Sequence, residues 1–159
     1  MRIVENTLHE PLDEVLSLPL FCFVGTVSRD GEPRVSPLWY LWEEERMWIL
    51  ADRTKTYYTR LQRQPKTAIA VVDFDPVDAR VRHIGMRGTS ELVDVEPDRV
   101  KRKLTRYLGG DEDQWDPMFH DLDTDRWKFL AFTPETIVAR NQSYQPSLPD
   151  NTMSDAAIE

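Results

Sequence analysis

The sequence predicts a mainly β domain, a six-stranded antiparallel β-barrel with α-helical decorations. Residues 21–51 contain three short apolar segments separated by two turn sequences, which is typical of consecutive hairpins. Further β-rich runs follow at 67–74 and 79–94, and the helical patterns between them are short. Because the strands follow one another as hairpins and not as strand-helix-strand units, a closed barrel is favoured over an open α+β sheet, which remains the alternative.

Composition limits the classes of protein that the chain can belong to. Its 159 residues suffice for one domain with a core, which we place at 1–142, followed by an acidic tail at 143–159. The net charge of −8 argues against nucleic acid as a partner. No apolar run is long enough to span a bilayer and no signal peptide is recognisable, so we expect a cytoplasmic protein without membrane contact. Cys22 is the single cysteine and is interpreted as a small buried hydrophobe.

The first half of the chain is expected to contain one short helix and three antiparallel strands. The helix covers 8–18 and stops at Pro19. Asp30-Gly31 supplies the positive φ angles of a tight hairpin turn. The three strands are predicted at 21–28, 34–42 and 47–51, with an acidic turn at 43–46.

A second helix is expected from Thr54, as its N-cap, to Gln64, with Pro65 ending it. Tyr57, Tyr58 and Leu61 would form its buried stripe. The apolar run at 67–74 is predicted to be a strand buried on both faces.

The strand at 79–94 contains Gly85 and Gly88, which indicate a bulge or a close approach of another group. A third helix starts at Pro97 and ends at Gly109-Gly110, with apolar-face spacing at Val100, Lys103, Leu104, Tyr107 and Leu108. An acidic, partly helical segment is expected at 111–125. Two final strands are predicted at 126–133 and 136–140, interrupted by Pro134.

One segment carries the chemistry of an anion site. Arg53-Thr54-Lys55-Thr56 is positively charged, contains two hydroxyls and opens the second helix. A helix N-terminus presents free N–H groups and the positive end of a dipole, so the added cations suit a phosphate group. The alternative is a solvated basic helix start, and the preceding strands favour the phosphate.

The order of elements resembles the split-barrel flavoproteins of the pyridoxamine 5′-phosphate oxidase-like superfamily, from about Leu20 to Arg140. The resemblance is carried by three sequences, GEPRVSPLWY at 31–40, LQRQPKTA at 61–68 and MRGTSELV at 86–93. It implies the FMN-binding split-barrel fold, a homodimer and an FMN-dependent oxidoreductase that acts on a small organic molecule. The alternatives are a deazaflavin-dependent reductase, or a non-enzymatic flavin or haem carrier.

The resemblance also implies site residues for the cofactor. The strand along the flavin ring would contribute Arg34, Val35, Ser36, Pro37 and Trp39. Leu50 and Ala51 would approach the ribityl chain, and the phosphate would be held by Arg53, Thr54, Lys55 and Thr56. Arg82 and His83 would lie near the ring, and Trp127 and Arg140 would close the site from the partner subunit.

The chain departs from the family pattern at one position. Family members usually carry Lys or Arg eight residues before the proline that ends the second helix, and here that residue is Tyr57. Either Arg53, Lys55 or Arg60 covers the phosphate instead, or phosphate binding is weak. Catalytic residues are not identified by the pattern. The three histidines and Cys22 show no zinc-ligand spacing, so no metal site is expected.

Overall fold

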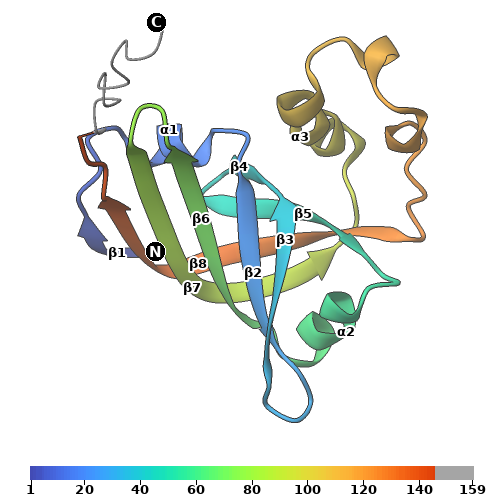
Figure 1. Cartoon of the computed structure of the whole chain (residues 1–159). Coiled ribbons are helices and arrows are strands. Elements are labelled where there is room, and N and C mark those ends of the chain that lie inside the picture. The colour runs from blue at the N-terminus through green and yellow to red at the C-terminus, as the bar shows by residue number, and fades with distance from the viewer. Residues whose placement is uncertain (146–159) are drawn as a thin grey trace, which may run out of the picture.

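A single curled sheet of eight strands dominates the computed structural model, which describes residues 1–145 (Figure 1). The hydrogen-bonded order is β3-β2-β6-β7-β8-β5-β4, all antiparallel, and β1 pairs with β8 in parallel. The strands are β1 (Arg2–Asn6), β2 (Phe21–Val27), β3 (Pro33–Trp39), β4 (Leu41–Glu43), β5 (Arg46–Asp52), β6 (Lys66–Asp75), β7 (Arg80–Val93) and β8 (Trp127–Asn141). The mainly β split-barrel fold is thus confirmed, with eight strands in place of six.

The strand predicted at 34–42 is divided at Tyr40. Its first part, β3, pairs with β2, whereas its second part, β4, pairs with β5. At the division the Tyr107 hydroxyl replaces a neighbouring strand. The hydroxyl oxygen accepts a hydrogen bond from the Tyr40 N–H at 3.0 Å, and the hydroxyl lies 2.9 Å from the Tyr40 carbonyl oxygen, to which it can donate. The chain can therefore turn a corner of the barrel without leaving buried backbone groups unsatisfied.

The two final strands predicted on either side of Pro134 are one continuous strand, β8. Pro134 lies opposite Gly88, where the register of β7 and β8 shifts between Arg87 and Gly88. This is the irregularity that the glycine predicted, and proline is tolerated in a sheet at such a bulge. A Cβ atom on Gly88 would lie 2.1 Å from the Thr133 carbonyl oxygen, so this residue must be glycine.

Strand β6 was expected to be buried on both faces, and this expectation is wrong. Its residues alternate between a buried inner face, with Ile69 and Val71, and an outer face on which Val72 and Phe74 are 39% and 58% exposed. Apolar residues on both faces had suggested two covered faces. No other element of the described chain covers the outer face.

Helices α1 and α2 are shorter than predicted at both ends. Helix α1 covers only Leu12–Leu16, and α2 (Thr56–Arg63) begins after Lys55 because the Thr54 hydroxyl instead donates to Asp52 Oδ1 at 2.7 Å. Thr54 is therefore not the N-cap. Helix α3 (Pro97–Leu108) begins and ends as predicted, and the acidic segment contains two 3₁₀ turns, η1 (Glu112–Gln114) and η2 (Pro117–Phe119).

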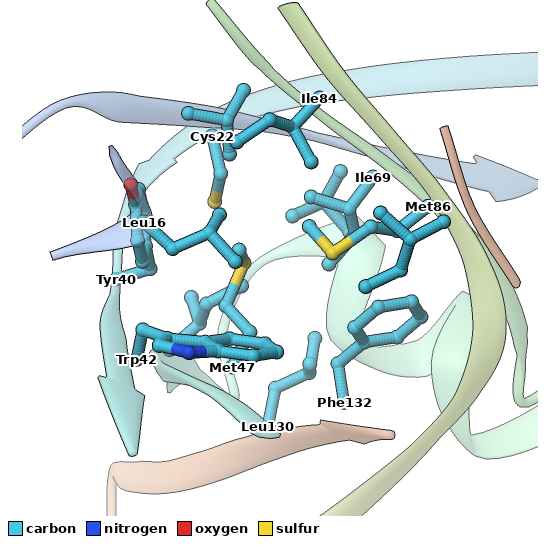
Figure 2. Close-up of a cluster of buried hydrophobic side chains, with 14 of the residues drawn as sticks. Leu16, Cys22, Tyr40, Trp42, Met47, Ile69, Ile84, Met86, Leu130 and Phe132 are labelled. Carbon is cyan, nitrogen blue, oxygen red and sulfur yellow. The ribbon is translucent and has the colours of Figure 1, made fainter. Parts of the chain in front are cut away.

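Two apolar clusters stabilise the fold. The larger one fills the inside of the curled sheet, where Leu16, Cys22, Met47 and Phe132 are fully buried (Figure 2). Cys22 is fully buried, as predicted, and burial raises the pKa of its thiol to about 12. The second cluster lies between α3 with the acidic segment and the outer face of β4, β5 and β8.

Within the described residues, no helix has the length and hydropathy needed to cross a membrane.

The backbone stays attached to the sheet just beyond the predicted domain boundary, since the N–H of Gln142 donates to the Val81 carbonyl at 2.8 Å. Most of the predicted tail, 146–159, lies outside the described part of the chain, and the boundary stays a prediction.

Candidate functional site

A cavity of about 400 Å³ lies between the edge of the barrel and the segment that follows β7. Its floor is formed by the ends of β3 and β5 and the start of α2, and its roof by α3 and η2. This volume falls in the range of small-molecule sites. Its lining consists of Ser36, Pro37, Leu38, Trp39, Leu50, Asp52, Lys55, Tyr57, Lys103, Leu104, Met118, Phe119, Leu122 and Trp127.

Ion pairs fix the roof of the cavity to the barrel. Arg102 donates to both Glu43 carboxylate oxygens, at 2.7 and 2.9 Å, and Arg99 reaches the same carboxylate at 3.3 Å. The Arg99 guanidinium also lies 3.7 Å from the ring centroid of Trp48. The two arginines hold the pKa of Glu43 below its usual range. Helix α3 is therefore held rigidly against the β4–β5 hairpin.

Two aromatic rings of a stack of three, those of Trp39 and Phe119, form one wall of the cavity. The Trp39 ring lies parallel to Tyr107 at a centroid distance of 4.5 Å and near-parallel to Phe119 at 5.9 Å. These residues come from β3, α3 and η2, so the stack joins the barrel to its cap. Flat aromatic walls are suited to a flat, conjugated ligand.

A buried cation lies in this wall. Lys103 is only 3% exposed, and its Nζ lies 5.6 Å from the Trp39 ring centroid and 5.7 Å from that of Tyr107. Burial lowers the pKa of this amine to about 8. The ammonium form still predominates at neutral pH.

The loop between β5 and α2 is organised by Asp52 at the other end of the cavity. Its carboxylate accepts hydrogen bonds from the Thr54 N–H and hydroxyl and from Arg126, at 2.9, 2.7 and 2.7 Å. These donors hold the pKa of Asp52 well below its usual range. The Asp52 N–H donates to the Tyr57 hydroxyl at 2.9 Å. The loop that precedes α2 is thereby fixed beside the cavity.

The structure brings six of the predicted cofactor residues together around the cavity: Ser36, Pro37, Trp39, Leu50, Lys55 and Trp127. Their roles stay predictions. Within the basic loop, only Lys55 borders the cavity. Arg53 donates to the Asp125 carbonyl oxygen at 2.9 Å, and Arg60 donates to the hydroxyls of Thr26 and Thr56.

The remaining predicted residues lie elsewhere. Ala51 faces the barrel core, and Arg34 is exposed and donates to the Pro33 carbonyl. Arg82 is buried in an ion pair with Asp73 and also contacts Glu10 at 2.8 Å. A separate hollow on the outer sheet face is lined by residues that include Val35, His83 and Arg140.

Sequence reasoning missed eight residues of the cavity. Lys103 and Leu104 were already placed on the buried stripe of α3, so a lysine among apolar residues was the available signal. The residues from the acidic segment could not be located from the sequence, because its charge suggested a solvated loop. The missed residues are Leu38, Asp52, Tyr57, Lys103, Leu104, Met118, Phe119 and Leu122.

The curled antiparallel sheet defines a split-barrel protein, and the cavity at its capped edge is its candidate small-molecule site. The sequence matches the profile of the family described as Pyridoxamine 5′-phosphate oxidase over residues 8–137, and the chain belongs to this family. A search of curated proteins found no match.

Solved structures support the same fold at low sequence identity. A conserved hypothetical protein from Mycobacterium tuberculosis is 19% identical with a TM-score of 0.67, covering 86% of this chain and 89% of its own. An F420 reductase is 24% identical with a TM-score of 0.62, covering 82% and 98%. The haem storage protein HutZ from Vibrio cholerae is 15% identical with a TM-score of 0.62, covering 80% and 92%. At these identities the similarity shows the fold alone.

Proposed function

We propose that this protein binds a flavin-type cofactor, FMN, in the cavity beneath α3 and acts as an oxidoreductase on a small organic molecule. The observation that carries the proposal is the cavity itself, which has flat aromatic walls at one end and Lys55, at the start of α2, at the other. This arrangement fits a molecule with a planar ring and a phosphate-bearing chain.

A bound flavin would supply hydride or electron transfer, and the protein would contribute binding, orientation and local charge. Trp39, with Phe119 beside it, offers an apolar surface for a ring. Lys55 offers a cation to the phosphate, because its side chain borders the cavity and makes no ion pair with the described residues. Arg53, which the sequence also suggested, is engaged by the Asp125 carbonyl.

A deazaflavin-dependent reductase is the second candidate, and it is favoured by the structural similarity to the F420 reductase. The same aromatic walls would suit a deazaflavin ring. Haem is supported by the similarity to the haem storage protein, but the cavity fits it less well. None of the described residues that line the cavity is His or Cys, two of the usual axial ligands of haem iron.

The proposal is tested by titrating FMN and riboflavin, which lacks the phosphate, and following the quenching of flavin fluorescence. A charge-assisted hydrogen bond is worth about 1.5–3 kcal/mol, so Lys55→Ala should weaken FMN binding about 10- to 100-fold. Riboflavin binding should hardly change. Lys66→Ala, which removes an exposed lysine paired with Glu135, is the control for a lost charge. Equal affinity of the wild type for both flavins would remove the phosphate role from Lys55.

We also propose that the protein is a homodimer that uses the outer face of β2, β3 and β6. Six large apolar side chains are 38–66% exposed on these strands: Phe21, Phe23, Val27, Val35, Val72 and Phe74. A contiguous exposed apolar surface favours a protein partner, and a second copy would bury well over ~1,000 Å². Light scattering at micromolar concentration tests this, and a monomeric mass would contradict it.

A further inference from the structure

Lys103 has a position that packing does not explain. It lies on the buried stripe of α3, where an apolar side chain would fill the same space without a charge. Two other cations of this helix, Arg99 and Arg102, bind the Glu43 carboxylate. Lys103 has no hydrogen bond or ion pair with any described residue, and its ammonium group makes cation–π contacts with the rings of Trp39 and Tyr107.

Burial of an ammonium group without an oxygen partner is unfavourable, because the group loses its hydration. The two cation–π contacts, both longer than 5.5 Å, compensate for only part of that loss. Since Lys103 lines the cavity, a ligand there can supply the missing partner. A negatively charged oxygen atom would be the complementary group.

The other residues that line the cavity indicate which class of ligand carries this anionic oxygen. Around Lys103 the lining is aromatic or aliphatic, with Trp39, Leu104 and Phe119 nearby. Asp52 does not neutralise the lysine: its carboxylate forms an ion pair with Arg126 and accepts from Thr54, and it forms none with Lys103. The cavity therefore combines flat apolar walls with one cation that lacks an anionic partner.

We infer that the Lys103 ammonium binds an anionic oxygen of a planar, conjugated ligand, so that the cavity selects aromatic or conjugated organic anions such as carboxylates, phenolates and enolates. This deepens the proposed function and rests on it in one respect, namely that the same cavity is the ligand site. The anion can belong to the substrate or to the reduced ring of a flavin-type cofactor.

The test uses two fluorescent probes that differ in one charged group. 1-Anilinonaphthalene-8-sulfonate carries a sulfonate, whereas N-phenyl-1-naphthylamine has the same ring systems without it. Lys103→Met should lower the affinity for the sulfonate probe about 10- to 100-fold relative to the neutral probe. Lys103→Arg should keep most of the preference. Lys101→Met is the matched control, because Lys101 lies on the same helix but pairs with Glu112 outside the cavity.

The ratio of the two dissociation constants separates this site from the exposed apolar sheet face, because any probe bound on that face would be unaffected by the loss of Lys103. An unchanged ratio in Lys103→Met would overturn the inference. Should the variant fail to fold, the wild type alone gives an answer, since sulfonate binding should fall as the pH rises and Lys103 loses its proton. The other ionisable side chains near the cavity are Cys22, Asp52, Lys55, Tyr57 and Tyr107. An affinity for the sulfonate probe that is constant from pH 7 to 10 would then refute the inference.

Flavin measurements distinguish the two sources of the anion. If Lys103 binds the reduced cofactor ring, Lys103→Met should make the midpoint potential of bound FMN more negative. If it binds the substrate, that potential should stay unchanged while aromatic carboxylates lose affinity for the FMN-loaded protein. A failure of FMN to bind would contradict the proposed cofactor. The probe titration contains no flavin, so its result would still decide the inference about Lys103.

Discussion

Replacing Lys103 by methionine should change the pH dependence of stability in a way that only a buried amine can produce. The side chain is 3% exposed, and its pKa is lowered from 10.5 to about 8 by loss of hydration. Because the pKa of this amine is lower in the folded state, the native protein releases the proton at a lower pH than the unfolded chain does. The unfolded chain therefore binds more protons between pH 8 and 10.5, and the contribution of Lys103 to stability rises through this interval.

The size of the effect follows from the two pKa values. A difference between 10.5 and about 8 corresponds to about 3 kcal/mol, at about 1.4 kcal/mol for each pH unit. Below pH 8 both states hold the proton, and the full penalty of the buried charge applies. We therefore expect Lys103→Met to be more stable than the wild type at pH 7, and this advantage to decline by up to about 3 kcal/mol as the pH approaches 10.5.

Other groups titrate in the same range, so the comparison must be between the two proteins. Burial raises the pKa values of Cys22 and Tyr107 to about 12, which lowers the stability of both proteins at alkaline pH. The contribution of Tyr107 cancels in the difference, whereas that of Cys22 cancels only in part, because the charge of Lys103 lowers the pKa of this thiol in the wild type. Urea unfolding of both proteins at pH 7.5 and 10 measures the difference, with Lys101→Met as the exposed control. A stability difference that does not change with pH would refute the reasoning.

Two further predictions concern the backbone of the sheet. Gly88→Ala should destabilise the fold by about 1–3 kcal/mol in guanidinium unfolding, since the new Cβ would lie 2.1 Å from the Thr133 carbonyl oxygen. The control is Gly110→Ala, which should change the stability little because no atom lies within 4 Å of the new Cβ. Glu45→Gly should stabilise the protein by about 0.5–1 kcal/mol, because Glu45 has a φ of 55° in the β4–β5 turn, and an unchanged melting temperature would argue against strain there.

The order of elements could be predicted from the sequence because turn residues and apolar periods are local signals. The helix from Pro97 to Leu108 and the buried stripe of Tyr57, Tyr58 and Leu61 agree with the structure. The continuity of β8 could not be predicted, since proline normally ends a strand, and the bulge at Gly88 that accommodates Pro134 depends on a partner far along the chain.

The candidate site was predictable only in part. The strand residue Trp39 and the loop residue Lys55 line the cavity, as their positions in the pattern indicated. The roof could not be anticipated, because Met118 and Phe119 lie in a segment whose acidic composition hides its few apolar residues. Their contact with the barrel depends on how α3 is clamped by Arg99 and Arg102, a long-range interaction with the turn at Glu43.

The most direct test of the central proposal is a crystal structure of the protein grown with FMN, or with a deazaflavin if FMN does not bind. We predict density for a planar ring in the cavity against Trp39, with its phosphate at Lys55. Density confined to the outer-face hollow beside Val35, His83 and Arg140, or a cavity without the ring, would contradict it.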